Sequence, residues 1–283
     1  MKHSALLITG LCLCATIVAC SSKKGSNEGD NMATDSVRTD RTLIELSYQL
    51  PDDPKKKCEV KLSLDYPIAY QSESDLARLN SLLASQIFGP EYSRYTSLKE
   101  AADSAAQSTL NEMKEGLTTL CNEIELTSEI TFTSLTQIMP VYNNGNFLSY
   151  NSSSYSYEGG AHGINNSFYY VIYLPTMSRI TLSDIIAPEY TDSVHQMLIN
   201  TLVKNLDLKN SKALIDVGYF DPENITATEN FYINDKGVTW VYNPYEIGCY
   251  ALGETSITLS YNDISYFIPE NSPISCMLNI QTK

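Results

Sequence analysis

The sequence is poor in positive charge and in the residue patterns that form catalytic centres. It holds 19 Lys and Arg against 33 Asp and Glu, with three His and one Trp among 283 residues. The net charge of −14 disfavours nucleic acid as a partner, because the chain would repel a phosphate backbone. No nucleophile elbow, phosphate-binding glycine loop or zinc-ligand spacing occurs. We therefore expect a protein that is not an enzyme and that uses no metal or cofactor.

Apolar runs of membrane-spanning length are also missing. The longest run, from Ala5 to Ala19, is shorter than the roughly 20 residues that a spanning helix needs. It follows Lys2 and ends in Ile-Val-Ala before Cys20, where small residues lead into a cysteine rather than an Ala-x-Ala site. This pattern predicts a lipoprotein signal peptide over residues 1–19 and a lipid on Cys20, with a plain anchor helix as the alternative. Acylation would hold the chain in the cell envelope, at the outer membrane, on its periplasmic face or at the cell surface.

Residues 20–42 contain almost nothing to bury and predict a flexible tether after the lipidated cysteine. Ordered structure is expected from about Leu43. Because Lys2 is the one Lys or Arg before Cys20, its removal changes the net charge from −14 to −15. Such a surface would attract a basic extracytoplasmic partner, although acidity also serves solubility alone.

Four cysteines remain after Cys20, an even number in a compartment that permits disulfides. We predict the pairs Cys58–Cys121 and Cys249–Cys276, because each pair lies within one half of the chain. Buried free thiols are the alternative.

The hydrophobic pattern predicts an α+β fold, with helices packed on antiparallel sheets in two intimately associated halves, residues 43–156 and 157–283. Helices are expected where apolar residues recur every three to four positions, over residues 72–88, 97–120 and 191–208. Strands are expected over residues 43–50, 58–66, 124–142, 147–157, 167–174, 256–261 and 274–280, with a hairpin over residues 231–243.

Several stretches of the second half resemble a family of unknown function. The family forms the extracytoplasmic, lysozyme-binding region of the anti-sigma-V factor and also precedes the catalytic domain of a peptidoglycan deacetylase. The stretches are residues 157–163 (YEGGAHG), 179–186 (RITLSDII), 230–237 (NFYINDKG) and 243–248 (NPYEIG). The resemblance covers roughly residues 43–270 and implies the fold, the envelope location and a binding role, with no catalytic residues to carry over. Asp-Ser-aliphatic tripeptides at residues 35, 103 and 192 resemble the glycosylation acceptor of Bacteroidetes envelope proteins, which is typical of a lipoprotein of that group.

Tyrosine is the residue type that most favours a binding surface, since it combines apolar area with a hydroxyl group. We expect the contact surface in residues 155–166 and in the loop 245–250, although tyrosine is also an ordinary strand residue. The candidate binding residues are Tyr155, Tyr157, Glu158, His162, Tyr245 and Glu246.

The leading interpretation is a non-enzymatic binding module for a lysozyme-like extracytoplasmic protein or for cell-wall glycan. One alternative is a peptidoglycan-active hydrolase, in which His162 would act as a base oriented by Glu158 or Asp184. A structural envelope component is another.

Overall fold

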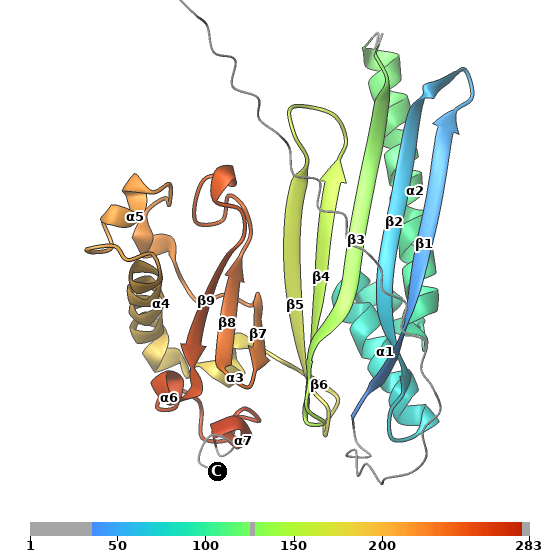
Figure 1. The fold of residues 1–283 in the computed structure, drawn as a ribbon. Coiled ribbons are helices and arrows are strands. Elements are labelled where there is room, and N and C mark those ends of the chain that lie inside the picture. Colours follow the sequence, from blue (N-terminus) through green and yellow to red (C-terminus); the bar gives the residue numbers. More distant parts are fainter. Residues whose placement is uncertain (1–35, 125–127, 279–283) are drawn as a thin grey trace, which may run out of the picture. The chain divides into compact units, whose positions relative to one another are not determined.

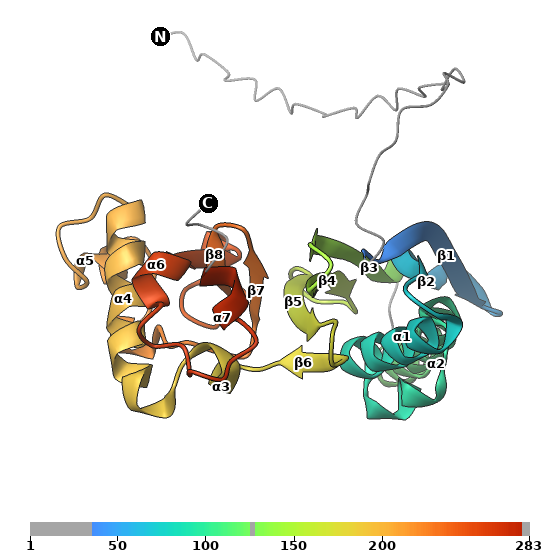
Figure 2. The ribbon, with the colours of Figure 1, turned by 90° about the horizontal axis from the view of Figure 1, so that it is seen from below.

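The computed structural model describes residues 36–124 and 128–278, which belong to one compact unit, Ala33–Lys283. The predicted signal peptide, Cys20 and most of the predicted tether lie outside the described residues. Two sheets, of six and three strands, pack with helices (Figures 1 and 2), so the predicted α+β fold class is confirmed. No helix among the described residues has the length and apolar character needed to cross a membrane.

The larger sheet has its strands in chain order. Its members are β1 (Arg38–Leu50), β2 (Asp53–Ala69), β3 (Ile130–Asn143), β4 (Phe147–Tyr157), β5 (Ile164–Tyr173) and β6 (Ser178–Ile180). β1 begins inside the segment predicted as tether, so ordered structure starts earlier than Leu43. The expectation of purely antiparallel sheets was wrong at one pair, because β2 and β3 run parallel. Parallel neighbours need a long crossover connection, which two helices supply here.

The two crossover helices are α1 (Glu73–Phe88) and α2 (Leu98–Glu123), joined through η1 (Pro90–Arg94). Both begin as predicted, since the hydroxyls of Ser72 and Ser97 accept the first-turn N–H groups of Asp75 and Glu100. They cover one face of the larger sheet, where their apolar side chains form a core with the even-numbered residues of β2, β3 and β4. Cys58, Leu64 and Tyr150 are fully buried in this core.

Two predicted strands differ from the structure. β3 begins at Ile130 rather than at residue 124, because α2 continues to Glu123 and Ile124 caps it. The expected strand over residues 274–280 was wrong, since Ser275–Leu278 forms the short helix α7. Ile274 and Met277 are both buried, and a spacing of three residues fits a helical turn rather than a strand.

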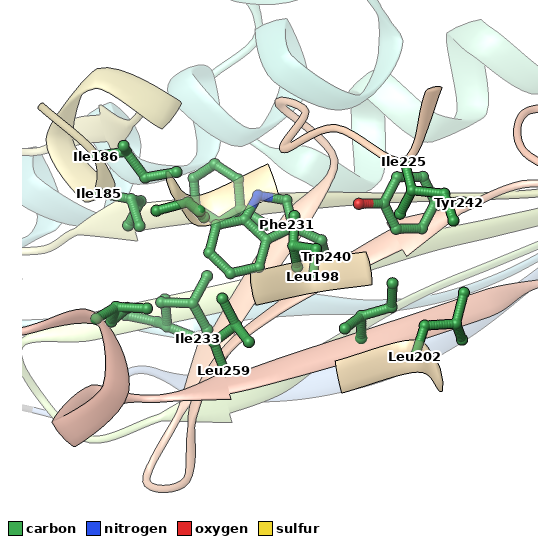
Figure 3. Close-up of a cluster of buried hydrophobic side chains, with 14 of the residues drawn as sticks. Ile185, Ile186, Leu198, Leu202, Ile225, Phe231, Ile233, Trp240, Tyr242 and Leu259 are labelled. Carbon is green, nitrogen blue, oxygen red and sulfur yellow. The ribbon is translucent and has the colours of Figure 1, made fainter. Parts of the chain in front are cut away.

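The smaller sheet contains β7 (Phe231–Asn234), β8 (Gly237–Tyr242) and β9 (Thr255–Ser260), all antiparallel. Helix α4 (Thr191–Asn205) packs against it through Leu198 and Leu202, and Trp240 lies fully buried in this second core (Figure 3). The short helices are α3 (Leu182–Ile185), η2 (Pro188–Tyr190), α5 (Ala213–Asp216), η3 (Pro222–Asn224), η4 (Tyr250–Leu252) and α6 (Tyr261–Ile264).

The smaller sheet lies beside β5 (Figures 1 and 2), and side-chain hydrogen bonds join the two sheets. Ser149 Oγ donates to Ile233 O at 3.1 Å, and Phe147 belongs to the second core. The Asn230 amide bridges the sheets, because it donates to Ser167 O at 2.9 Å and to Val241 O at 3.0 Å. Since β5 and β6 complete the larger sheet, the change from one sheet to the other comes after Ile180 rather than at residue 157.

The four cysteines after Cys20 are free thiols, so the predicted disulfides Cys58–Cys121 and Cys249–Cys276 are absent from the structure. Cys58 points into the core under α2, and burial raises the pKa of its thiol to about 11. Cys249 lies next to Gly218, whereas Cys276 belongs to α7. These two cysteines are therefore in different parts of the fold and have different neighbours.

Candidate functional site

The odd-numbered face of the larger sheet, opposite α1 and α2, is only partly covered. Where β4 begins and β5 ends, the side chains of Phe147 and Val171 belong to the core of the smaller sheet. Further along these strands the same face carries polar side chains and a few exposed apolar ones, such as Leu43 at 60% exposure. Strand register places two adjacent rows there, Leu43–Ser63–Gln137–Ser153–Ser167 and Glu45–Lys61–Leu135–Tyr155–Asn165.

All residues of these rows except Glu45 line a groove of about 330 Å³. A second hollow of about 410 Å³ continues from it toward the loop 243–254, because Asn165 and Ser167 line both. Among the described residues that line the first groove, Lys61 is the one side chain with a full charge, and it is paired with Glu45 at 2.9 Å. The groove therefore offers uncharged amides and hydroxyls beside the ring of Tyr155.

The glycine corner after β4 contacts the loop 245–250, of which Tyr250 lines the second hollow. The His162 and Tyr250 rings stack with centroids 4.3 Å apart, and Tyr245 packs on Tyr250 at 5.4 Å. Tyr250 Oη donates to Gly163 O at 2.8 Å, so a hydrogen bond fixes the loop to the corner. Tyr245 has a positive φ of 72° and remains 53% exposed.

Two further candidates have mainly local roles. Tyr157 Oη donates to Gly160 O at 3.1 Å and closes the corner. The Glu246 carboxylate accepts the backbone N–H of Asn243 at 3.0 Å and thereby shapes the loop. The side-chain oxygen of Asn243 in turn accepts the backbone N–H of Ser167 at 2.6 Å. Glu246 therefore acts on the groove indirectly, through Asn243.

The residues of the hydrolase alternative are not arranged as a catalytic pair. His162 Nδ1 lies 2.9 Å from Gly163 O, so this ring nitrogen donates a hydrogen bond to a backbone carbonyl. Asp184 is used elsewhere, since it accepts the N–H of Thr181 at 2.8 Å at the start of α3. Glu158 is exposed, and no hydrogen bond joins it to His162 in the part of the chain that the structure describes. Within the described ranges, no three His, Cys, Asp or Glu side chains are grouped as a metal site would require.

Beside the groove, burial and, to a lesser extent, the Glu254 carboxylate raise the pKa of Tyr169 to about 12. Tyr169 therefore stays a neutral phenol at physiological pH. Its ring packs against Tyr232 at 4.8 Å, across the contact of β5 with β7.

Sequence reasoning did not identify the polar floor of the groove. Ser153, Gln137 and Asn165 come from three strands, and only their register places them together. One local signal was present, because three consecutive serines, residues 152–154, occupy a central strand where larger residues are usual. Small side chains leave a trough in the sheet surface at this point.

Comparisons with known proteins agree with this architecture. A family model described as a protein of unknown function (DUF3298) matches residues 183–262, and one described as deacetylase PdaC matches residues 54–165. A DUF3298 family member from Bacteroides fragilis has a similar structure, with a TM-score of 0.74 and 22% identity over 87% of this chain and 99% of its own. A DUF3298 family protein from Pseudomonas aeruginosa has a TM-score of 0.56 and 14% identity over 84% and 98%. No curated protein matched the chain.

Proposed function

We propose that this protein is a non-enzymatic binding module of the cell envelope, and that its groove on the larger sheet takes an extended cell-wall glycan. The observation that carries the proposal is the set of uncharged polar side chains in the groove, whose one charged lining residue, Lys61, is paired with Glu45. Sugars present hydroxyl and amide groups, which need donors and acceptors, and apolar ring faces, which pack on aromatic rings. Gln137, Ser153 and Asn165 supply the first, and Tyr155 supplies the second.

The shape of the site supports a chain rather than a compact ligand. The groove continues into the hollow by the loop 243–254, so consecutive units can contact Tyr155 and then the region of Tyr250. The match to the deacetylase PdaC model spans residues 54–165, which include most of the groove lining. The resemblance to a family found with a peptidoglycan deacetylase favours the same ligand class.

Calorimetry with soluble peptidoglycan fragments tests the proposal. Tyr155→Ala should weaken binding about tenfold, or about 1.4 kcal/mol, because it removes the ring on which a sugar would pack. Ser153→Val should also weaken it, since the added methyl groups would fill the trough. Fragments that bind wild type and both groove variants equally, or that bind none of them, would refute a glycan site here.

A basic protein is a second candidate partner, favoured by the net charge of −14. Lysozyme is the natural probe, given the resemblance to a lysozyme-binding region. Attraction of this kind should weaken with salt, because the Debye length falls from about 10 Å at 0.1 M to about 3 Å at 1 M. Saturable lysozyme binding that is unchanged by Tyr155→Ala would identify a different surface from the groove.

A further inference from the structure

A second cavity lies on the opposite face of the same strand, on the side of α1 and α2. It has a volume of about 240 Å³ and is lined by the end of α1, the middle of α2 and strands β2 to β5. Its floor includes the buried side chains of Val60, Leu62 and Ala106. A water molecule occupies about 30 Å³ in the liquid, so the cavity has the volume of about eight waters. A cavity of that size suits a small ring rather than a drug-sized ligand.

Hydroxyl groups form one side of this cavity. They belong to Ser134, Thr136, Ser152 and Ser154, on neighbouring positions of β3 and β4. Within the described part of the chain, none of these side chains makes a hydrogen bond, although each is at most half-exposed. The hydroxyls are thus free to donate to a ligand and to accept from it.

Aromatic rings form the other side. Phe168 pairs across the strands with Ser152 and is 45% exposed, which is unusual for a phenylalanine at a cavity wall. Tyr170 and Phe88 also line the space. No charged side chain belongs to the described lining. The Arg179 guanidinium, 5.8 Å from the ring centroid of the lining residue Tyr170, donates to Gln86 Oε1 at 2.9 Å. This chemistry fits a neutral ligand with a polar edge and an apolar face.

We propose that this cavity binds a single neutral pyranose ring bearing a substituent that ends in an apolar methyl, such as an N-acetyl group. The hydroxyl row would meet the ring hydroxyls, Phe168 would pack on the ring face, and the substituent would enter the apolar floor. The site is separate from the groove of the proposed function, because the side chains of Ser152 and Ser153 point to opposite faces of β4. It would give the protein a subsite for a free chain end or a released monosaccharide.

The test uses N-acetylglucosamine as the probe and amide NMR shifts of the purified protein as the readout. Saturable shifts should concentrate at Ala105, Ala106 and Thr109, with a dissociation constant of the order of 1 mM for so small a ligand. Ser152→Val should weaken binding about tenfold by filling the site. Phe168→Ala should weaken it similarly and alters an exposed side chain, so it serves if the serine variant is unstable.

Ser153→Val is the matched control, since it changes the adjacent residue on the other face. Shifts at Ala105, Ala106 and Thr109 that survive Ser153→Val and are lost in Ser152→Val and Phe168→Ala support the site. Absence of saturable shifts, or shifts confined to Asn165 and Ser167, would overturn it. Either of these results leaves the groove on the other face to be decided by its own variants.

Discussion

Gly163 should tolerate no side chain, because it lies buried between the strand and the corner that form the candidate site. A Cβ atom placed there would collide with the Tyr155 ring and would come within 2.6 Å of Ser156 O. The backbone oxygen cannot move without disturbing β4, and its strand neighbours hold Tyr155 in place. We therefore expect Gly163→Ala to cost about 1–3 kcal/mol, the usual range for overpacking.

The measurement is reversible urea or thermal unfolding followed by circular dichroism. A loss of 1 kcal/mol lowers the melting temperature by about 2–4 °C in a domain of this size. Glycan binding should weaken as well, because the Tyr155 ring must shift and the Tyr250 bond to Gly163 O is disturbed. Equal unfolding midpoints for wild type and Gly163→Ala would refute the close approach on which this reasoning depends.

Gly116→Ala provides a control with the same chemical change and the opposite expected sign. This glycine is inside α2, and its added Cβ would lie 3.6 Å from the Phe132 ring, an ordinary van der Waals contact. Alanine in place of a helical glycine should stabilise the protein by about 0.5–1 kcal/mol. Destabilisation by both variants would indicate that alanine is poorly tolerated for reasons other than the local contacts.

Three further predictions concern the smaller sheet and its contact with the larger one. Asn230→Ala should lower the free energy of unfolding, measured in urea, by about 2–4 kcal/mol, because it removes the amide that bonds to backbone groups of β5 and β8. A loss below about 1 kcal/mol would contradict this bridge between the sheets. Trp240→Ala should cost about 3–5 kcal/mol by leaving a cavity in the second core, and a near-neutral effect would contradict its full burial. Burial lowers the pKa of His195 below its ordinary 6.5, so the folded state favours the neutral ring and stability should fall as pH drops through that value. The loss should level off below the folded-state pKa. His195→Met should reduce the pH dependence of the melting temperature between pH 7 and 5, and equal slopes in wild type and variant would contradict the assignment.

Part of the candidate site was predictable because its signals are local. The glycine corner and the loop at Tyr245 stood out in the sequence, and the structure brings them together through the His162–Tyr250 stack. The groove floor was not predictable, since Gln137, Ser153 and Asn165 become neighbours only through strand register. The roles of Glu246 and Asp184 as backbone acceptors likewise depend on partners that hydropathy does not reveal.

The sequence by itself determined the elements that depend on neighbouring residues. Ser72 and Ser97 start the two long helices because an N-cap hydroxyl bonds to a backbone group three positions later. The turns before Phe147 and at Gly237 follow equally local rules. Alternation and periodicity were sufficient to predict an α+β class.

Tertiary structure decided whatever required distant segments to meet. The parallel pairing of β2 with β3 and the join of β5 to the larger sheet depend on which faces bury the most apolar area together. The free state of the four cysteines was decided in the same way, since chain order does not say whether two thiols face each other. Spacing along the chain encodes local hydrogen bonds, but contacts between distant residues are selected by packing over the whole unit.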